Sequence, residues 1–193
     1  MWGRIQLLDW AGTMQNTSTY NPMKIGISSL GKSWSIVPEV LGFLDPQRFD
    51  FYRNHPEYGN IKDMRKQYGI EGIDEMWIVT TTDNETVQAF EKNVKWFKTI
   101  TNPPILRGWA CEGIPDLNTP LQCRQVRNLI YLILLTAHRR IPKEVSGVLH
   151  VSLAGGRKTI SADLQDAAFY FGCSNLIHII EQTSQQQSHS TQK

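Results

Sequence analysis

The sequence has few cysteines and no long apolar run. Its three cysteines, Cys111, Cys123 and Cys173, are far apart and odd in number. Neither a disulfide framework nor a zinc site is therefore indicated, and we expect a cytoplasmic protein. The longest apolar run, around residues 129–137, is too short to cross a bilayer. These absences exclude disulfide-rich secreted domains, zinc modules and membrane-spanning proteins.

The net charge is also small. The chain has 20 lysine and arginine residues against 18 aspartate and glutamate residues, a formal net charge of +2. Proteins that bind duplex DNA usually carry a strongly basic face, which this balance does not indicate. Any contact with a nucleotide is therefore expected in a local pocket. No carboxylate pair or His/Cys cluster has the spacing of metal ligands, so no metal and no cofactor are expected.

The composition that remains is that of one globular domain with polar ends. Hydrophobic residues make up 40% of the chain and charged residues 20%, which allows a core to be buried. We expect residues 1–22, which are polar and end at a proline, to be a flexible N-terminal extension. Residues 182–193 are almost wholly Gln, Ser, Thr and His, typical of a disordered tail or a linker. The folded domain is assigned to residues 23–181.

Strand and helix patterns alternate along this domain. Strands are predicted at residues 23–29, 75–81, 105–111, 148–153 and 176–180. Helices are predicted at residues 36–44, 61–68, 84–97, 119–138 and 162–171, with an irregular segment at 45–60. Near-continuous apolar strands alternating with helices predict an α/β fold, a Rossmann-like parallel sheet with helices on both faces. In such sheets ligands bind outside the carboxyl ends of the strands.

The most informative segment is residues 148–161, where an apolar strand ends in Ala-Gly-Gly-Arg-Lys-Thr-Ile-Ser. Gly155 and Gly156 allow a left-handed backbone and a close approach to a ligand. Arg157 and Lys158 place two positive charges directly after this turn. Glycines, cations and a helix start in this order predict a phosphate-binding site. An ordinary strand-to-helix turn with two solvated cations is the alternative.

Two hydroxyl residues, Thr159 and Ser161, follow the cations at the predicted start of the helix. Thr159 or Ser161 could cap the helix by accepting hydrogen bonds from its first amides. Asp116, in the loop before the preceding helix, either contacts the same site or closes an Asx-turn. His150 lies within the strand, where alternation predicts a buried, hydrogen-bonded core histidine.

The turn after the first strand offers two interpretations. Residues 26–33 match the P-loop pattern G-x-x-x-x-G-K-S, which would place Lys32 and Ser33 on the phosphates and Mg²⁺ of ATP or GTP. However, Gly26 is expected to lie inside the strand rather than at its end. Pro38 would also interrupt a helix that began directly after Ser33. A P-loop NTPase is therefore the third and least favoured hypothesis.

The same turn suits a ligand without a metal. Ser29 and Ser33 place hydroxyls at the end of the first strand, with Lys32 between them. Trp34 could stack a nucleobase, although a tryptophan in the core is the commoner outcome. Thr81 would add a hydroxyl to the same rim, or serve simply as a good strand residue.

Two segments together resemble the CRISPR-associated Rossmann-fold (CARF) domain family. Residues 30–41 resemble its first-strand motif, and residues 149–161 resemble its second and more specific signature. Residues 78–81 and 114–119 fit between them in the expected order. The resemblance covers roughly residues 23–181, the extent of the predicted domain. The sequence departs from the family pattern at Trp34, at Pro38 and in an aromatic, charged insert at residues 45–68.

The resemblance implies binding of a cyclic oligoadenylate, such as the cyclic tetra- or hexa-adenylate messengers of type III CRISPR defence. It also implies a homodimer with the ring across the two-fold axis. The helix at residues 119–138 is a candidate interface, although helix–sheet packing would explain its apolar residues equally well. Some family members are ring nucleases, in which a ribose 2′-hydroxyl attacks the adjacent phosphate without a metal and leaves a 2′,3′-cyclic phosphate.

Carried onto this sequence, the resemblance assigns the catalytic roles to Lys158 and Ser33. Lys158 would stabilise the developing charge, and Ser33 would position the scissile phosphate or ribose. The ligand-binding residues would be Ser29, Gly31, Lys32, Trp34, Thr81, Gly155, Gly156, Arg157 and Thr159. No strong general base is evident, so a slow reaction is expected. The main rival to a ring nuclease is a sensor that binds the same ring without cutting it and controls an effector.

Overall fold

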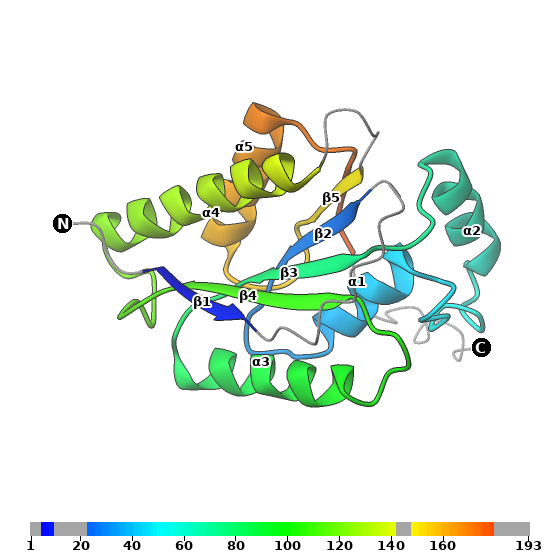
Figure 1. The fold of residues 1–193 in the computed structure, drawn as a ribbon, viewed down its shortest axis with the longest axis horizontal. Helices are drawn as coiled ribbons and strands as arrows, with labels where there is room; N and C mark the ends of the chain where they lie inside the picture. Colours follow the sequence, from blue (N-terminus) through cyan, green and yellow to red (C-terminus); the bar gives the residue numbers. More distant parts are fainter. Residues whose placement is uncertain (1–4, 10–22, 142–147, 180–193) are drawn as a thin grey trace, which may run out of the picture.

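The structure, a computed structural model, describes residues 5–9, 23–141 and 148–179 (Figure 1). Its sheet has six strands in the order β1-β4-β3-β2-β5-β6. Their bounds are β1 Ile5–Asp9, β2 Lys24–Ser29, β3 Glu75–Val79, β4 Ile105–Cys111, β5 Val148–Ser152 and β6 Asn175–Ile177. Strands β2 to β6 pair in parallel, and only β1 is antiparallel to its neighbour, β4. The predicted parallel sheet is confirmed.

The described residues form five helices. They are α1 Ile36–Leu44, α2 Tyr58–Gln67, α3 Asn84–Phe97, α4 Pro120–Arg140 and α5 Lys158–Phe171. Four of them cover the two faces of this sheet, and α2 packs beside α1. Buried residues of α4 and α5 form one core cluster with the side chains of one sheet face. Those of α1 and α3 form a second cluster on the other face. Figure 1 shows the two pairs of helices on opposite sides of the sheet. The protein therefore has the predicted Rossmann-like α/β fold, with helices on both faces.

Most predicted elements are found close to their predicted bounds. Helices α1 and α3 and strand β4 coincide with the predictions at 36–44, 84–97 and 105–111. Helix α2 begins three residues before the predicted 61–68 segment. Helix α5 begins at Lys158, not at residue 162, because the backbone turns into the helix directly after the double glycine.

Part of the N-terminal segment forms a strand of the sheet. A flexible extension was expected over residues 1–22, but Ile5–Asp9 within it is an edge strand that pairs with β4. The expectation rested on the polar, Asn- and Thr-rich part of residues 1–22, whereas Ile5–Asp9 contains Ile5, Leu7 and Leu8. The free backbone groups of a strand edge can pair with such a segment. Residues 10–22 and the predicted tail at 182–193 lie outside the described residues.

Helix α4 packs on the sheet through one side. Six of its residues are buried in the core, namely Val126, Leu129, Ile130, Ile133, Leu134 and Ala137. Helix–sheet packing therefore accounts for most of its apolar content, while Leu121, Leu132 and Leu135 remain exposed on it. No helix in the described ranges combines the length and apolar content that crossing a membrane would require.

His150 lies in the core of β5, as predicted. Its side chain is 1% exposed, and its Nδ1 lies 3.1 Å from Nδ2 of Asn175. Burial, with a smaller contribution from the charge of Lys24, lowers the pKa of His150 to about 4. The imidazole is therefore neutral near pH 7, as a buried histidine without an acidic partner should be.

The order of the strands places a topological switch point between β2 and β5. From the central strand β2 the chain proceeds to β3 and β4 on one side. Helix α4 then carries it back across the sheet to β5, which pairs with β2 on the other side. The loops that follow β2 and β5 therefore leave neighbouring strands in opposite directions. In open α/β sheets this is where a ligand crevice forms.

Candidate functional site

The loops that follow β2 and β5 pack directly on each other. Ser29, the last residue of β2, is fully buried, and its hydroxyl donates to the carbonyl oxygen of Gly155 over 2.7 Å. A side-chain carbon added to Gly31 would lie 3.2 Å from the backbone N and Cα of Gly156. The structure thus brings together four of the predicted site residues, Ser29, Gly31, Gly155 and Gly156. Ser29 holds the turn together from inside, and its hydroxyl is not free for a ligand.

Both glycines of the turn have the left-handed backbone that was predicted. The φ angles are +81° at Gly155 and +67° at Gly156. A side-chain carbon at Gly155 would lie 2.8 Å from the carbonyl oxygen of Ser29 and 2.8 Å from Ile36. At Gly156 it would lie 2.8 Å from the Cβ of Ser29. Two glycines are therefore required here by the neighbouring strand as well as by the turn.

Helix α5 begins without a side-chain cap. Its N-cap residue is Arg157, in an extended conformation, and no side chain accepts from the first amides. The prediction that Thr159 or Ser161 caps the helix is wrong. Ser161 instead donates to the carbonyl oxygens of Leu153 (3.1 Å) and Gly155 (3.2 Å), and Thr159 is exposed. The first amides of α5 keep their capacity to bind an acceptor from a ligand.

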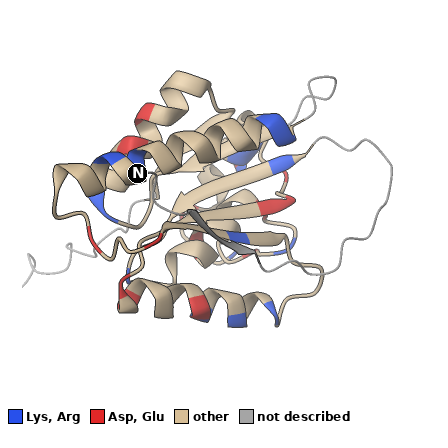
Figure 2. Cartoon of the chain, turned by 60° about the vertical axis from the view of Figure 1, so that its left-hand side comes forward, with Lys and Arg blue, Asp and Glu red and all other residues tan. Residues whose placement is uncertain are grey.

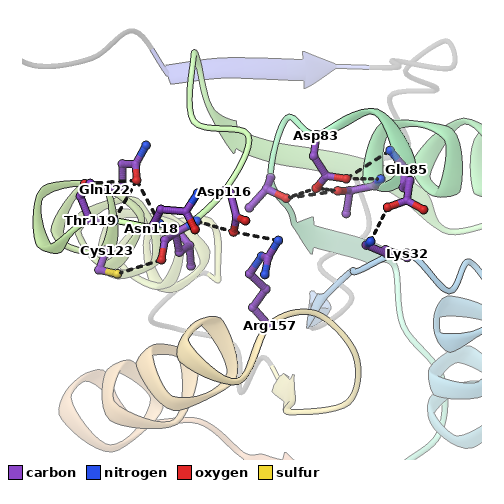
Figure 3. Close-up of polar contacts among 12 residues, drawn as sticks. Lys32, Asp83, Glu85, Asp116, Asn118, Thr119, Gln122, Cys123 and Arg157 are labelled. Atoms are coloured by element: carbon purple, nitrogen blue, oxygen red, sulfur yellow. Dashed lines mark hydrogen bonds and ion pairs between the residues drawn. The ribbon is translucent and has the colours of Figure 1, made fainter.

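Arg157 is paired with a carboxylate from another loop. Its Nη2 lies 2.7 Å from Oδ1 of Asp116, which follows β4 (Figure 3). The same Oδ1 accepts from the backbone N–H of Leu117 over 2.6 Å. Both side chains are partly exposed. Asp116 therefore holds the guanidinium in place beside the start of α5.

Lys32 is paired with the second residue of α3. Its ammonium contacts the carboxylate of Glu85, and both side chains are largely exposed (Figure 3). The hydrogen bond and the charge of Glu85 raise the pKa of Lys32. The charges of Asp83 and Arg157 also act on Lys32, in opposite directions. The loops after β2, β3 and β5 therefore place their charges within reach of one another.

Thr81 is buried and hydrogen-bonded to the N-cap of α3, and it does not line the exposed edge of the site. It is 4% exposed, and its hydroxyl donates to Oδ2 of Asp83 over 2.7 Å. Asp83 is the N-cap of α3 and accepts from the amides of Glu85 and Thr86. Burial raises the pKa of Asp83, but the hydrogen bonds from Thr81, Thr86 and Glu85 outweigh it and leave the pKa lowered. Thr81 thus supports a helix cap from inside the protein.

Three predicted residues remain accessible. The hydroxyl of Ser33 lies 2.9 Å from that of Ser35, on the surface. Trp34 is 38% exposed and is therefore not a core residue. Lys158, the first residue of α5, is exposed, and its ammonium has no partner among the described residues. These three side chains are free to contact a ligand.

The P-loop interpretation does not fit the backbone. Gly26 lies in the middle of β2, paired with Met76 on one side and His150 on the other. A side-chain carbon there would lie within 3.3 Å of Leu44, Ile73 and Met76. Gly26 is therefore inside the strand, as predicted, and serves close packing in the core. A phosphate loop cannot begin at a residue that is buried within a strand.

Sequence reasoning did not single out Glu85, and it left the role of Asp116 open. The available signal for Glu85 was its place in the first turn of a helix, where acidic residues are common. Its contact with Lys32 depends on the loop after β2 lying beside the loop after β3. The described surface carries both signs of charge, as the acidic and basic residues along α3 illustrate (Figure 2).

A cavity lies away from this site, between α2 and the β6 edge. Its volume is about 610 Å³. It is lined by Phe43, Tyr52, His55, Glu57, Ile61, Met64, Tyr68, Ile70, Ser174, Asn175, Leu176, Ile177, His178 and Ile179. None of the predicted site residues lines it.

Comparisons with known proteins leave the family of the chain open. No family model matches it, and no curated protein matches it. Among solved structures, a similar fold occurs in Enterococcus italicus Csm6 bound to cyclic hexa-2′-fluoro-hexa-dAMP, with a TM-score of 0.49 and 15% sequence identity. The match covers 83% of this chain and 34% of that one, so the chain spans about a third of the length of that protein.

Proposed function

We propose that this protein binds a cyclic oligoadenylate at the loops that follow β2 and β5. The observation that carries the proposal is the start of α5. Its first amides lack a side-chain cap, they follow a double glycine turn, and Arg157 and Lys158 flank them. A helix start with free amides and adjacent cations favours a phosphate group. Its place at the switch point of the sheet supports the proposal further.

An adenylate ligand suits the accessible groups better than a bare phosphate. Trp34 presents an exposed indole on the loop after β2, and aromatic side chains stack on nucleobases. The hydroxyl of Ser33 lies on the same loop and can bond a ribose or a phosphate oxygen. The resemblance of residues 30–41 and 149–161 to the CARF family motifs names the ligand class, a ring of adenylates.

The proposed assembly is a homodimer, because a two-fold symmetric ring can contact two copies of one site. Helix α4 is the candidate interface. Leu121, Leu132 and Leu135 are exposed on it, while its opposite side is buried in the core of the same protomer and is not available to a partner.

Cleavage of the bound ring is the second part of the proposal. The 2′-oxygen of a ribose forms a bond to the adjacent phosphorus while the bond from phosphorus to the 5′-oxygen breaks. The 2′-hydroxyl loses its proton and the departing 5′-oxygen gains one, so the products are a 2′,3′-cyclic phosphate and a 5′-hydroxyl. Lys158, unpaired among the described residues, would stabilise the charge on the phosphate, and Ser33 would position the reacting group.

A sensor that binds the ring without cutting it is the alternative, and one observation favours it. The carboxylates nearest the site, Asp83, Glu85 and Asp116, are each engaged with a cation or a helix start. None of them is free to act as a general base, so cleavage would depend on positioning and charge stabilisation alone.

The deciding experiment is incubation of the purified protein with cyclic tetra- and hexa-adenylate in the presence of EDTA, with the products resolved by chromatography. We expect linear products from the wild type and a large loss, about 100-fold or more, in Lys158→Ala, since a group that stabilises transition-state charge contributes a factor of this order. Lys92→Ala, on the exposed side of α3, is the matched control and should cut like the wild type. Tight binding without products would make the protein a sensor. The absence of both binding and cleavage would overturn the proposal.

A further inference from the structure

Two cations of the candidate site are occupied by carboxylates of the same chain. Lys32 contacts Glu85, and Arg157 contacts Asp116 over 2.7 Å. Lys158 is the third cation of the site and has no partner among the described residues. The site therefore offers a ligand one free cation and two paired ones.

Each pair joins two segments that are distant in the sequence. The cations come from the loops after β2 and β5, which form the switch point (Figure 3). Glu85 comes from the first turn of α3, and Asp116 comes from the loop after β4. Neither pair serves the closure of its own loop. The glycine turn is held by Ser29 and Ser161, and α3 is capped by Asp83. Because other contacts already hold the glycine turn and cap α3, the two ion pairs are expected to contribute little to the stability of the fold.

A carboxylate and a phosphate compete for the same face of an ammonium or guanidinium group. Both are oxygen anions, and Arg157 presents donors that suit either. A phosphate that reaches Lys32 or Arg157 must take the place of Glu85 or Asp116, or share the cation with it. Because these pairs are exposed, each is weak, and a ligand with several phosphates can displace both.

We propose that Glu85 and Asp116 are internal competitors of the ligand, which set the affinity of the site by occupying the cations that its phosphates would contact. This inference rests on the proposed function for the identity of the ligand, but the competition itself requires only an anion. It makes an unusual prediction, because removing two polar residues at the site should strengthen binding. Residues that contacted the ligand through its ribose hydroxyls would have the opposite effect.

The test is the sign of the change in affinity in Glu85→Gln and Asp116→Asn. Both replacements keep the shape of the side chain, and the amide introduced by Asp116→Asn retains an oxygen for the backbone N–H of Leu117. Dissociation constants are measured by calorimetry for cyclic tetra-adenylate and for inorganic pyrophosphate, at several salt concentrations. Each variant is expected to bind both anions about two- to fivefold more tightly, as the strength of exposed ion pairs implies. The double variant should show the product of the two factors.

Matched controls separate competition from a general change of charge. Glu91→Gln lies further along α3, and Glu112→Gln lies in the same loop as Asp116; both carboxylates are exposed. Neither control should change the affinity as the two test variants do. The salt dependence is a second readout. A cation freed from its carboxylate should release more bound counterions on binding, so the fall of affinity with salt should be steeper in the variants.

The outcomes distinguish this inference from the proposed function. If the wild type binds the ring and the variants bind it equally or more weakly, the proposal of internal competitors fails. The proposed function then stands. Variants that bind pyrophosphate more tightly while no form binds the ring support the competition and overturn the proposed ligand. If no form binds either anion, both proposals fail.

Discussion

At the scale of single residues, the double glycine turn is constrained by its contacts as much as by its backbone. Gly155 has a φ of +81° and leaves no space for a side chain between Ile36 and the carbonyl oxygen of Ser29. Gly113 has a φ of +73° in a loop where nothing lies within 4 Å of the added carbon. Both positions therefore require a left-handed backbone, but only Gly155 has neighbouring atoms that would overlap with a side chain.

This difference gives a prediction for two alanine variants. Both Gly155→Ala and Gly113→Ala should lose about 1–2 kcal/mol of unfolding free energy, because a left-handed backbone disfavours a Cβ. Gly155→Ala should lose a further ~1–3 kcal/mol from the forced overlap with Ser29 and Ile36. Urea unfolding followed by tryptophan fluorescence measures both. Equal losses in the two variants would show that the neighbouring strand does not restrict the turn.

The residues that sequence reasoning identified are those that lie together in the chain. Gly155, Gly156, Arg157 and Lys158 form one run, so their pattern could be recognised without the fold. The partners of the cations could not be identified in this way. Glu85 and Lys32 are brought together by the pairing of β2 with β3, and no local pattern records that contact.

At the scale of elements, the starts of three helices differ in a way that matters for binding. Helix α3 has Asp83 as its cap, and α4 has a capping box made by Thr119 and Gln122. Helix α5 has neither, although it follows the turn with the greatest positive charge. A helix whose first amides lack an acceptor is less stable than a capped one, and its stability is restored by an anion at that end.

A cap on α5 should therefore raise the stability of the protein and lower its affinity for the ligand. Two variants at Arg157 can test this. Arg157→Ser and Arg157→Ala both remove the guanidinium and its contact with Asp116. The serine hydroxyl can accept from the first amides of α5, so Arg157→Ser should be about 1 kcal/mol more stable than Arg157→Ala. It should also bind cyclic tetra-adenylate more weakly, because the cap occupies the amides that the phosphate would use. Thermal unfolding and calorimetry measure the two effects. If the more stable variant also bound more tightly, the amides of α5 would not be the phosphate site.

Element prediction succeeded where apolar periodicity was strong and failed where hydrogen bonds set the boundary. Helix α3 repeats apolar residues at helical spacing, and its bounds agree with the sequence pattern. The start of α5 was placed four residues too late, since the cations and hydroxyls of its first turn carry no apolar signal. Strand β1 was missed because residues 1–22 were judged by their polar, Asn- and Thr-rich part, although Ile5, Leu7 and Leu8 lie at their start.

At the scale of the whole molecule, the order of the strands was not predictable from the sequence, yet it determines the site. Alternating strands and helices indicate a parallel sheet but do not say which strands are neighbours. The pairing of β2 with both β3 and β5 brings the loops of residues 30–35 and 153–157 together. The same pairing places His150 beside Gly26 in the centre of the sheet, where its pKa falls to about 4.

The stability of the whole molecule should therefore depend on pH through His150. Its pKa is about 4 in the folded protein, against about 6.5 in an unfolded chain, so protonation favours unfolding. The contribution of the neutral imidazole is complete above about pH 6.5 and is lost as the pH falls toward 4. Between pH 7.5 and pH 5 this amounts to about 2 kcal/mol of unfolding free energy.

The measurement is urea unfolding at a series of pH values for wild type, His150→Gln and His55→Gln. His150→Gln removes the titrating group and should flatten the loss of stability over this range, whatever its effect on stability at pH 7.5. His55 is exposed, and its replacement controls for the loss of a histidine at the surface. His150→Leu serves as a second variant if the glutamine side chain prevents folding. Since the comparison uses the slope, carboxylates that titrate in all forms cancel. A slope in both His150 variants as steep as that of the wild type would mean that His150 binds its proton equally well in the folded and unfolded protein, and that its pKa is not lowered by burial.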